Sequence, residues 1–537
     1  MIREDVREAA PAAQSPAQTS ARTPAAGTAS GGGPSRPARH PLVPRRVHLL
    51  GAGGAGVSGA ARILAERGHV VSGHDRCESE HTALLRAAGV PLEIGDAGRA
   101  RLPEGVELLV RSAAVPETDP TVLEARERGV EVKKYSELVA RIAPAGRTLA
   151  VAGTHGKTTT SWMVLHALRG LARAARGALP EAGALPQPGA LSQPGALPQP
   201  GALPQPGALI GGICRTLGTN ALAGEEGGWF AVEACEYDRS FLQLAPSGAI
   251  VTNVEADHLD YYGDLDAIVA AFARFADRVA PLGLLVLGRA APRRVESAAR
   301  CATWRFGREL KAEVTGERAG CFAFRLRGPG FGAEVALGVP GEFNVENASL
   351  ALALVVGLAA REWNLEAAGA AQLAARGLEE CIGSRRRFEP WGSHGEVDVV
   401  HDYAHHPTEV RVTLEAARRA LPGKPLHVLF QPHQHSRTAR FLGEFIESLR
   451  SADRVVVADV YGARAHIDGE HLAGAPELVE GLRRAGVDAV AGGPGPEAAA
   501  IFARSLPRRA AALVLGAGDI DQVKDELLGH LALRSAV

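Results

Sequence analysis

The sequence has few cysteines, few aromatic residues and no surplus of charge. Its 537 residues include six cysteines and 5% aromatic residues. The cysteines lie far apart and form no C-x-x-C pair, which argues against a disulfide framework. We therefore expect reduced, buried thiols at Cys77, Cys214, Cys235, Cys301, Cys321 and Cys381.

Charge balance argues against a polyanionic partner. Lysine and arginine total 59 and aspartate and glutamate total 60, so the formal net charge is -1. Neither DNA nor an acidic membrane surface is an expected partner of so neutral a chain without a local basic patch. We expect no nucleic-acid partner.

A long hydrophobic run is also missing. The most apolar stretch, Ala348 to Ala360, is too short to cross a bilayer, and the first five residues are partly acidic with no apolar segment behind them. We expect no membrane insertion, a cytoplasmic location, and a monomer or a homodimer.

Two segments lack the pattern of a packed fold. Residues 1–44 are mostly Ala, Pro, Ser, Gly and Thr, which predicts a disordered tail. From Gly183 to Leu209 the hexapeptide GALPQP recurs with one change, and its prolines disfavour helix and central strand. We interpret this repeat, about 183–209, as an exposed insertion in a surface loop.

The remaining chain alternates strand-like apolar runs with amphipathic helical stretches, the pattern of α/β proteins with parallel sheets. Its length predicts about three domains. We expect three α/β domains at 45–146, 147–382 and 383–537, with ligands at the carboxyl ends of the strands.

A phosphate-binding loop is predicted at VAGTHGKTTT, Val151 to Thr160. The glycines allow backbone N–H groups to approach a phosphate, and Lys157 and Thr158 supply a cation and a metal-binding hydroxyl. Gly153 and Gly156 are three residues apart, closer than in the usual pattern. An ATP site is the favoured interpretation, and an ordinary glycine turn before a helix is the alternative.

A second glycine-rich loop, GAGGAG, begins at Gly51 and is followed by Asp75 some 24 residues later. This pattern suits a diphosphate at a helix N-terminus, from either NAD or a UDP-sugar. A tight turn that binds nothing is the alternative.

Two apolar runs downstream end in acidic residues. One ends at Glu233, Glu236 and Asp238, and the other at Asn253, Glu255 and Asp257 followed by His258. Oxygen-rich groups near an ATP site suit Mg2+, and solvated acidic loops are the alternative.

Histidines gather in the last domain, at His401, His405, His406, His433 and His435. A zinc site is the less favoured interpretation, because they follow two separate strands and no cysteine accompanies them. Anion recognition together with Arg437 and Arg440, or hydrogen bonding to a substrate, is favoured.

Nine motifs, in order, resemble those of the Mur ligases, from about Arg45 to the C-terminus. They are GAGGAGVSG, GTHGKTTT, VEACEYDRSFL, TNVEADHLDYYG, PGEFNVENA, GSRRRFE, HDYAHHPTEV, FQPHQHSRT and LGAGDI. The resemblance implies a UDP-sugar-binding Rossmann-like domain, a central P-loop ATPase-like domain and a Rossmann-like ligase domain. It also implies an ATP- and Mg2+-dependent amide ligase that joins L-alanine to UDP-N-acetylmuramate through an acyl phosphate.

The resemblance implies four groups of site residues. The catalytic residues would be Lys157, His405 and Arg437. ATP would contact Gly153, Thr154, His155, Gly156, Lys157, Thr158, Thr159, Asn344, Asn347, Arg387 and Asp402. UDP-sugar would contact Gly51, Gly53, Gly54, Ala55, Gly56, Asp75 and Ser112, and the metal would contact Thr158, Glu233 and His258.

Three positions depart from the family pattern. Phe343 and Asp96 stand where histidine is usual, and Gln434 stands where arginine is frequent. These changes bear on contacts to adenine, to the uridine end and to the substrate carboxylate. They leave the amino-acid preference open.

Three rival functions remain at this point. A ligase that attaches a recycled tripeptide to UDP-N-acetylmuramate shares the Glu236-Tyr237-Asp238 run, although RSFLQL and DHLDYYG favour the alanine reaction. An NAD-dependent oxidoreductase with a regulatory ATP module, and a nucleotide-gated binding module without turnover, are the other two.

Overall fold

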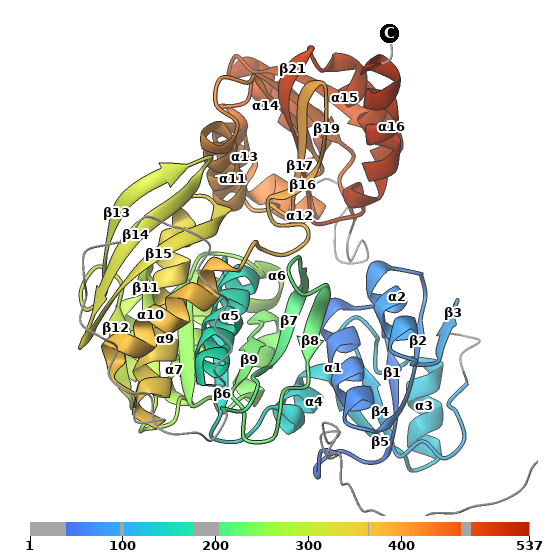
Figure 1. The fold of residues 1–537 in the computed structure, drawn as a ribbon. Coiled ribbons are helices and arrows are strands. Elements are labelled where there is room, and N and C mark those ends of the chain that lie inside the picture. The colour runs from blue at the N-terminus through green and yellow to red at the C-terminus, as the bar shows by residue number, and fades with distance from the viewer. Residues whose placement is uncertain (1–38, 97–100, 176–202, 363–364, 463–473, 536–537) are drawn as a thin grey trace, which may run out of the picture. The chain divides into compact units, whose positions relative to one another are not determined.

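The computed structural model describes residues 39–96, 101–175, 203–362, 365–462 and 474–535. Figure 1 shows three successive α/β regions, each built on its own sheet, which confirms the expected fold class. The exact domain boundaries stay predictions. Most of the expected disordered tail and the repeat as far as residue 202 lie outside the described residues.

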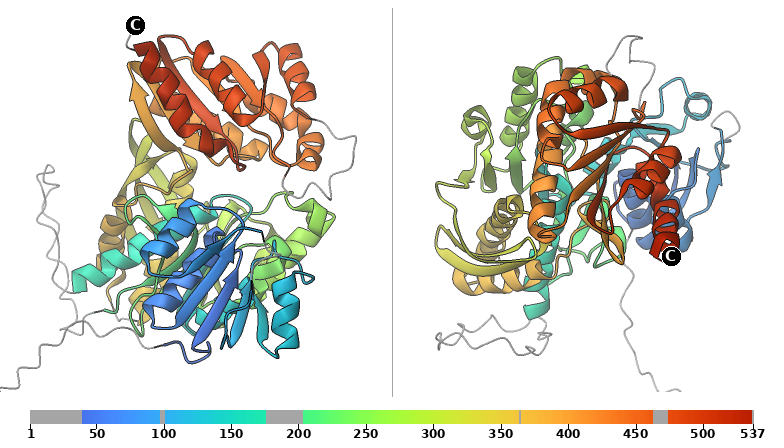
Figure 2. Two further views of the ribbon diagram at one scale, coloured as in Figure 1. Left: turned by 90° about the vertical axis from the view of Figure 1, so that its right-hand side faces the viewer. Right: turned by 90° about the horizontal axis from the view of Figure 1, so that it is seen from above.

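The first region is a parallel sheet with the strand order β3-β2-β1-β4-β5. Helices α1 and α4 pack in one core cluster and α3 in another, so both faces are covered (Figure 2). The strands are β1 (Arg46–Leu50), β2 (Val70–Asp75), β3 (Leu92–Ile94), β4 (Leu108–Arg111) and β5 (Glu131–Lys134). The helices are α1 (Ala55–Glu66), α2 (Glu80–Ala87), α3 (Pro120–Glu127) and α4 (Tyr135–Ile142).

The central region is a sheet with the order β12-β11-β10-β6-β9-β7-β8, parallel except for β8. The strands are β6 (Thr148–Ala152), β7 (Gly207–Cys214), β8 (Thr219–Leu222), β9 (Phe230–Glu233), β10 (Gly248–Asn253), β11 (Leu284–Ala290) and β12 (Ala302–Arg305). The helices are α5 (Lys157–Ala175), η2 (Tyr237–Gln243), α6 (Leu259–Tyr262), α7 (Leu265–Asp277), α8 (Arg293–Ala298), α9 (Phe343–Glu362) and α10 (Ala367–Glu379).

A separate antiparallel sheet in the central region departs from the parallel pattern that the sequence predicts. It consists of β13 (Lys311–Arg318), β14 (Cys321–Gly328) and β15 (Phe331–Pro340). Side chains of β15 alternate strictly between buried and exposed, as expected for a sheet with one face on the core. That alternation in FGAEVALGVP is the signal that could have predicted it.

The last region is a sheet with the order β16-β17-β21-β18-β19-β20, in which only β16 is antiparallel. The strands are β16 (Glu389–His394), β17 (Glu396–Asp402), β18 (Leu426–Phe430), β19 (Arg454–Ala458), β20 (Asp488–Gly493) and β21 (Arg509–Leu515). The helices are α11 (Pro407–Ala420), α12 (His435–Arg440), α13 (Leu442–Leu449), α14 (Ala475–Arg484), α15 (Gly495–Ser505), η3 (Ile520–Val523) and α16 (Lys524–Ser535).

The tail and the repeat, which we expected from their composition to lie outside the packed fold, both contain packed residues. At the first described residues, the His40 N–H donates to His69 Nε2 at 3.0 Å, and Val43 is buried. The last GAL of the repeat, Gly207–Leu209, opens strand β7 and is buried, so it is no exposed linker. Alanine and leucine fit a central strand once the prolines have ended.

Two further expectations concern the thiols and the membrane. All six cysteines are free, but Cys77 and Cys235 are exposed, which contradicts the expectation that all are buried. The run from Ala348 lies in α9, within the largest core cluster. In the part of the chain that the structure describes, no helix combines the length and the hydropathy needed to span a bilayer.

Candidate active site

The predicted phosphate loop lies between β6 and α5, at the point where the central sheet changes winding direction. Gly153 has φ 142° and Gly156 has φ 80°, angles that favour glycine. The end of β10 holds this loop: the N–H of Thr154 donates to Asn253 O at 3.1 Å, and the N–H of His155 donates to Asn253 Oδ1 at 2.9 Å. The loop is therefore preformed at the carboxyl end of the sheet.

The side chain of Lys157 is held within this loop. Its Nζ donates to Gly153 O at 2.6 Å, to Thr154 O at 3.0 Å and to Glu236 Oε1 at 3.0 Å. Burial lowers the pKa of Lys157, but the Glu236 carboxylate outweighs it and raises the pKa to about 12. The loop thus carries a fixed positive charge at neutral pH.

Two of the three predicted metal ligands are in contact. Thr158 Oγ1 donates to Glu233 Oε1 at 3.0 Å, and the other oxygen of Glu233 accepts from the Gly211 N–H at 2.8 Å. His258 Nε2 lies 3.8 Å from Glu236 Oε1, the carboxylate that holds Lys157. A hydroxyl and a carboxylate beside a phosphate loop fit a hard cation such as Mg2+.

A cavity of about 380 Å³ opens beside the loop. Its walls include His155, Gly156, Thr158, Thr159, Phe343, Asn344, Asn347, Arg387 and Asp402. Most predicted ATP contacts therefore line one cavity, although they come from β6–α5, α9 and the last region. The Nδ2 of Asn347 donates to Asn344 Oδ1 at 3.0 Å, which orients both amides.

Asp402 ends strand β17 on the far wall of this cavity. Its two oxygens accept from the N–H groups of Phe388 and Ala404, each at 2.8 Å. Burial raises the pKa of Asp402 to about 6, even though Arg387 favours the charged form. The Asp402 carboxyl group therefore changes its charge close to neutral pH, and the two backbone hydrogen bonds fix its position.

His405 and Arg437, two of the predicted catalytic residues, lie in a second group of side chains. Arg437 Nη2 donates to Asp257 Oδ1 at 2.6 Å, and its Nη1 lies 3.1 Å from His433 Nδ1. The rings of His405 and His433 are 5.6 Å apart. Burial raises the pKa of Asp257, but the Arg437 guanidinium outweighs burial and holds this pKa well below its usual range. Asp257, which belongs to the central region, therefore fixes the position of Arg437 in the last region.

The first glycine loop follows β1, where the sheet order also reverses. Gly51 has φ 70°, and a Cβ there would lie 2.7 Å from Ser112 Cβ. The Gly53 N–H donates to Asp75 Oδ2 at 2.7 Å, and Gly54 caps the α1 helix that begins at Ala55. The structure thus brings the predicted UDP contacts together, with Gly56 packed on Tyr135.

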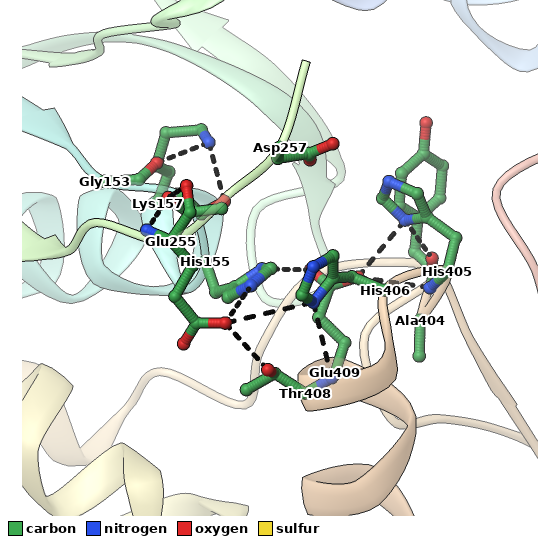
Figure 3. A network of polar contacts seen from close by, with 12 residues as sticks. Gly153, His155, Lys157, Glu255, Asp257, Ala404, His405, His406, Thr408 and Glu409 are labelled. Atoms are coloured by element: carbon green, nitrogen blue, oxygen red, sulfur yellow. Dashed lines mark hydrogen bonds and ion pairs between the residues drawn. The ribbon is translucent and has the colours of Figure 1, made fainter. Parts of the chain in front are cut away.

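Glu409 is a site residue to which the sequence assigned no role, although it lies in the HDYAHHPTEV motif. It lies in the first turn of α11 with its side chain 10% exposed, and its Oε1 is 3.2 Å from His155 Nδ1 (Figure 3). Its Oε2 accepts from the His405 N–H at 3.1 Å. Acidic residues are usual in a first helical turn, so a glutamate at this position does not by itself indicate a functional site.

His155 itself is surrounded by acids. Its Nε2 lies 3.5 Å from Glu255 Oε2, opposite the Glu409 contact. Burial lowers the pKa of His155, but the carboxylates of Glu255 and Glu409 raise it to about 9. This histidine of the phosphate loop thus lies between a carboxylate of the central region and one of the last region, at the wall of the cavity.

The departures from the family pattern have clear positions. Phe343 is 41% exposed and lines the cavity beside Asn344, so an aromatic side chain stands there in place of histidine. Gln434 is buried with φ 71° at the start of α12, and Asp96 is exposed.

The histidines of the last region do not form one cluster. His401 is buried apart from the others, with its Nδ1 2.8 Å from Val514 O.

Comparisons with known proteins give a consistent picture. Family models match residues 46–147 (Mur ligase family, catalytic domain), 219–355 (Mur ligase middle domain) and 386–520 (Mur ligase, glutamate ligase domain). UDP-N-acetylmuramate–L-alanine ligase of Rubrobacter xylanophilus is 39% identical over 90% of this chain and 100% of its own length. The same-named protein of Mycolicibacterium smegmatis is 38% identical over 91% and 96%.

A solved structure supports the fold. The UDP-N-acetylmuramate-alanine ligase of Thermotoga maritima aligns with a TM-score of 0.70 at 24% identity, covering 92% of this chain and 100% of that one. Three family models in succession and a relative matched over its whole length agree with the resemblance seen in the motifs. The chain belongs to the Mur ligase family.

Proposed function

We propose that this protein is an ATP-dependent amide ligase that joins L-alanine to UDP-N-acetylmuramate and releases ADP and phosphate. The observation that carries the proposal is the shared cavity beside the phosphate loop, lined by both the central and the last region. The curated relatives named above carry the name of this reaction. The six free thiols suit a reducing compartment, so we place the reaction in the cytoplasm.

ATP would occupy this cavity. Its phosphates would meet the N–H groups of the loop and Lys157, and adenine would lie against Asn344, Asn347 and the ring of Phe343. Asp402 would accept from the ribose. Arg387, whose guanidinium lies 3.5 Å from Glu409, would face the phosphates.

Thr158 and Glu233 would hold Mg2+, with His258 on the side of Glu236. Their hard oxygens are already adjacent, so the donor set fits this ion. When bound, Mg2+ supplies positive charge that stabilises the transferring phosphoryl group.

The chemistry follows from the placement of charge. A carboxylate is a poor acyl donor, so one of its oxygens first attacks the γ-phosphorus and ADP leaves. Lys157 stabilises the charge that develops on the transferred group. The amine of the amino acid then attacks the acyl carbon, phosphate leaves with the carboxylate oxygen, and the nitrogen loses a proton as the amide forms.

Arg437 would bind the carboxylate of the incoming amino acid, in the orientation that Asp257 gives it. His405 would face the amine and the muramoyl end. The UDP moiety would lie on the Gly51–Gly56 loop, with its diphosphate at the N-terminus of α1 and Asp75 behind the loop.

A substrate screen tests this proposal. Phosphate release from ATP is measured with UDP-N-acetylmuramate and, in turn, alanine, serine, glycine and a cell-wall tripeptide. We expect release only when the nucleotide sugar and an amino acid are both present, fastest with L-alanine, and no change in nicotinamide absorbance. Faster phosphate release with the tripeptide than with alanine would indicate the ligase that attaches a recycled tripeptide. Binding of UDP-N-acetylmuramate without phosphate release would indicate a binding module without turnover.

A further inference from the structure

Three side chains from separate parts of the chain face one another beside the cavity (Figure 3). They are His155 of the phosphate loop, Glu255 after β10 and His406 before α11. One donor atom of each lies within 4.8 Å of the other two. Glu255 Oε2 is 3.5 Å from His155 Nε2 and 4.0 Å from His406 Nδ1.

An ion bound between these side chains would displace the Nε2 proton of His155 and the Thr408 N–H from His406 Nδ1. The Thr408 N–H donates to His406 Nδ1 at 3.3 Å, so this nitrogen is unprotonated and its one lone pair accepts that bond. Glu409 lies 3.2 Å from His155 Nδ1 and so holds a proton on that nitrogen. Within the described residues, His155 Nε2 is buried without a hydrogen-bond partner.

This arrangement has the parts of a zinc site. Two imidazoles and one carboxylate form a known three-ligand set for Zn2+, and tetrahedral bonds of about 2.1 Å place donor atoms about 3.4 Å apart. Glu255 already lies 3.5 and 4.0 Å from the two imidazole nitrogens, and these nitrogens are at most 4.8 Å apart, so binding would draw the two rings together. Glu409 supplies the carboxylate that orients a metal-binding histidine from behind.

We propose that His155, Glu255 and His406 form a site for a divalent transition-metal ion of the Zn2+ type, separate from the Mg2+ position at Thr158 and Glu233. Imidazole favours such ions over Mg2+. Glu255 is 34% exposed and lines the cavity with His155, which gives an ion a route to the site. Metal would link the phosphate loop to the start of α11 and restrain the last region.

The sequence disfavours zinc because the histidines of the last region follow two separate strands. The structure brings in two ligands from the central region instead, so His406 is the one member that the last region supplies. The proposal does not depend on the ligase reaction, because metal binding is measured without substrates.

Cobalt spectroscopy tests the site. Metal-free full-length protein is titrated with Co2+ in excess Mg2+, and tetrahedral coordination is detected from its intense visible d–d band. We expect about one such ion per chain, displaced by Zn2+. The band should vanish in His406→Gln and Glu255→Gln, while Glu409→Gln should weaken binding by about 10- to 100-fold.

The matched control is His530→Gln, which removes a surface histidine 3.7 Å from Glu526. It should leave the band intact. His406 caps α11, so thermal melting is used to check that His406→Gln is folded. If that variant does not fold, Glu255→Gln still tests the site, because its amide oxygen can accept from the Thr408 hydroxyl. No tetrahedral band in the wild type, or a band that survives in both folded variants, would overturn the proposal.

Discussion

His155 and Glu409 are 254 residues apart in sequence, yet His155 Nδ1 lies 3.2 Å from Glu409 Oε1. The phosphate loop is thereby bonded to the first turn of α11 in the last region. Glu409 also lies 3.5 Å from Arg387, so one carboxylate links the loop to a predicted phosphate contact. Occupation of the cavity and the position of the last region should therefore depend on each other.

The His155 contact predicts a pH-dependent stability. Its pKa is raised from 6.5 to about 9, so the stabilisation is fully present below pH 6.5 and is lost as pH rises through about 9. The shift corresponds to about 3 kcal/mol at most. Thermal unfolding of wild type and His155→Gln should differ most near pH 6 and converge near pH 10. A difference that stays constant over this range would contradict the assignment.

Replacing Lys157 tests the phosphate loop. Lys157→Ala removes the fixed cation beside Glu236, and we expect kcat for phosphate release to fall by about 10²- to 10³-fold or more. UDP-N-acetylmuramate binding, measured by calorimetry, should change little because the Gly51 loop belongs to a different sheet. The exposed Lys311→Ala is the matched control. Turnover close to wild type in Lys157→Ala would remove the loop from the mechanism.

Arg437 should act on the amino acid rather than on ATP. Its side chain is 6% exposed and paired with Asp257, and removing one partner of such a buried pair costs about 2 to 5 kcal/mol. Arg437→Ala should therefore lower kcat/KM for L-alanine by at least about 30-fold, with a smaller change in KM for ATP. Asp257→Asn should give part of this loss.

A control and a contrary outcome define that test. Arg450→Ala removes an arginine that is 61% exposed, and its kinetics should match the wild type. Equal losses for ATP and alanine in Arg437→Ala would indicate a general structural role instead.

Asp75 should contribute to UDP-sugar affinity through the glycine loop. Asp75→Ala removes the acceptor of the 2.7 Å bond from the Gly53 N–H, whereas Asp75→Asn keeps an oxygen there. Losing the bond should weaken UDP-N-acetylmuramate binding by about 1 to 3 kcal/mol, and Asn should be intermediate. Calorimetric titration of the three proteins checks this order, and unchanged affinity in Asp75→Ala would show that the carboxylate is dispensable.

Local sequence was sufficient for the strand–loop–helix units. Glycines at positive φ, such as Gly51 and Gly156, mark backbone conformations that other residues avoid, so the two loops could be predicted without a fold. The apolar runs that form β1, β6 and β17 are mostly buried, and their hydrophobic pattern alone was enough to predict them as strands. The order of the motifs along the chain was then enough to indicate the family.

Contacts between distant segments needed the tertiary structure. Nothing in the spacing of His155, Glu255 and Glu409 indicates that their side chains meet, because their separation in space depends on how the central and last regions pack. The pKa of His155 follows from that meeting and not from the histidine itself. The sequence by itself thus determined which residues could bind phosphate, metal and nucleotide, and the tertiary structure decided which charges lie close enough to interact.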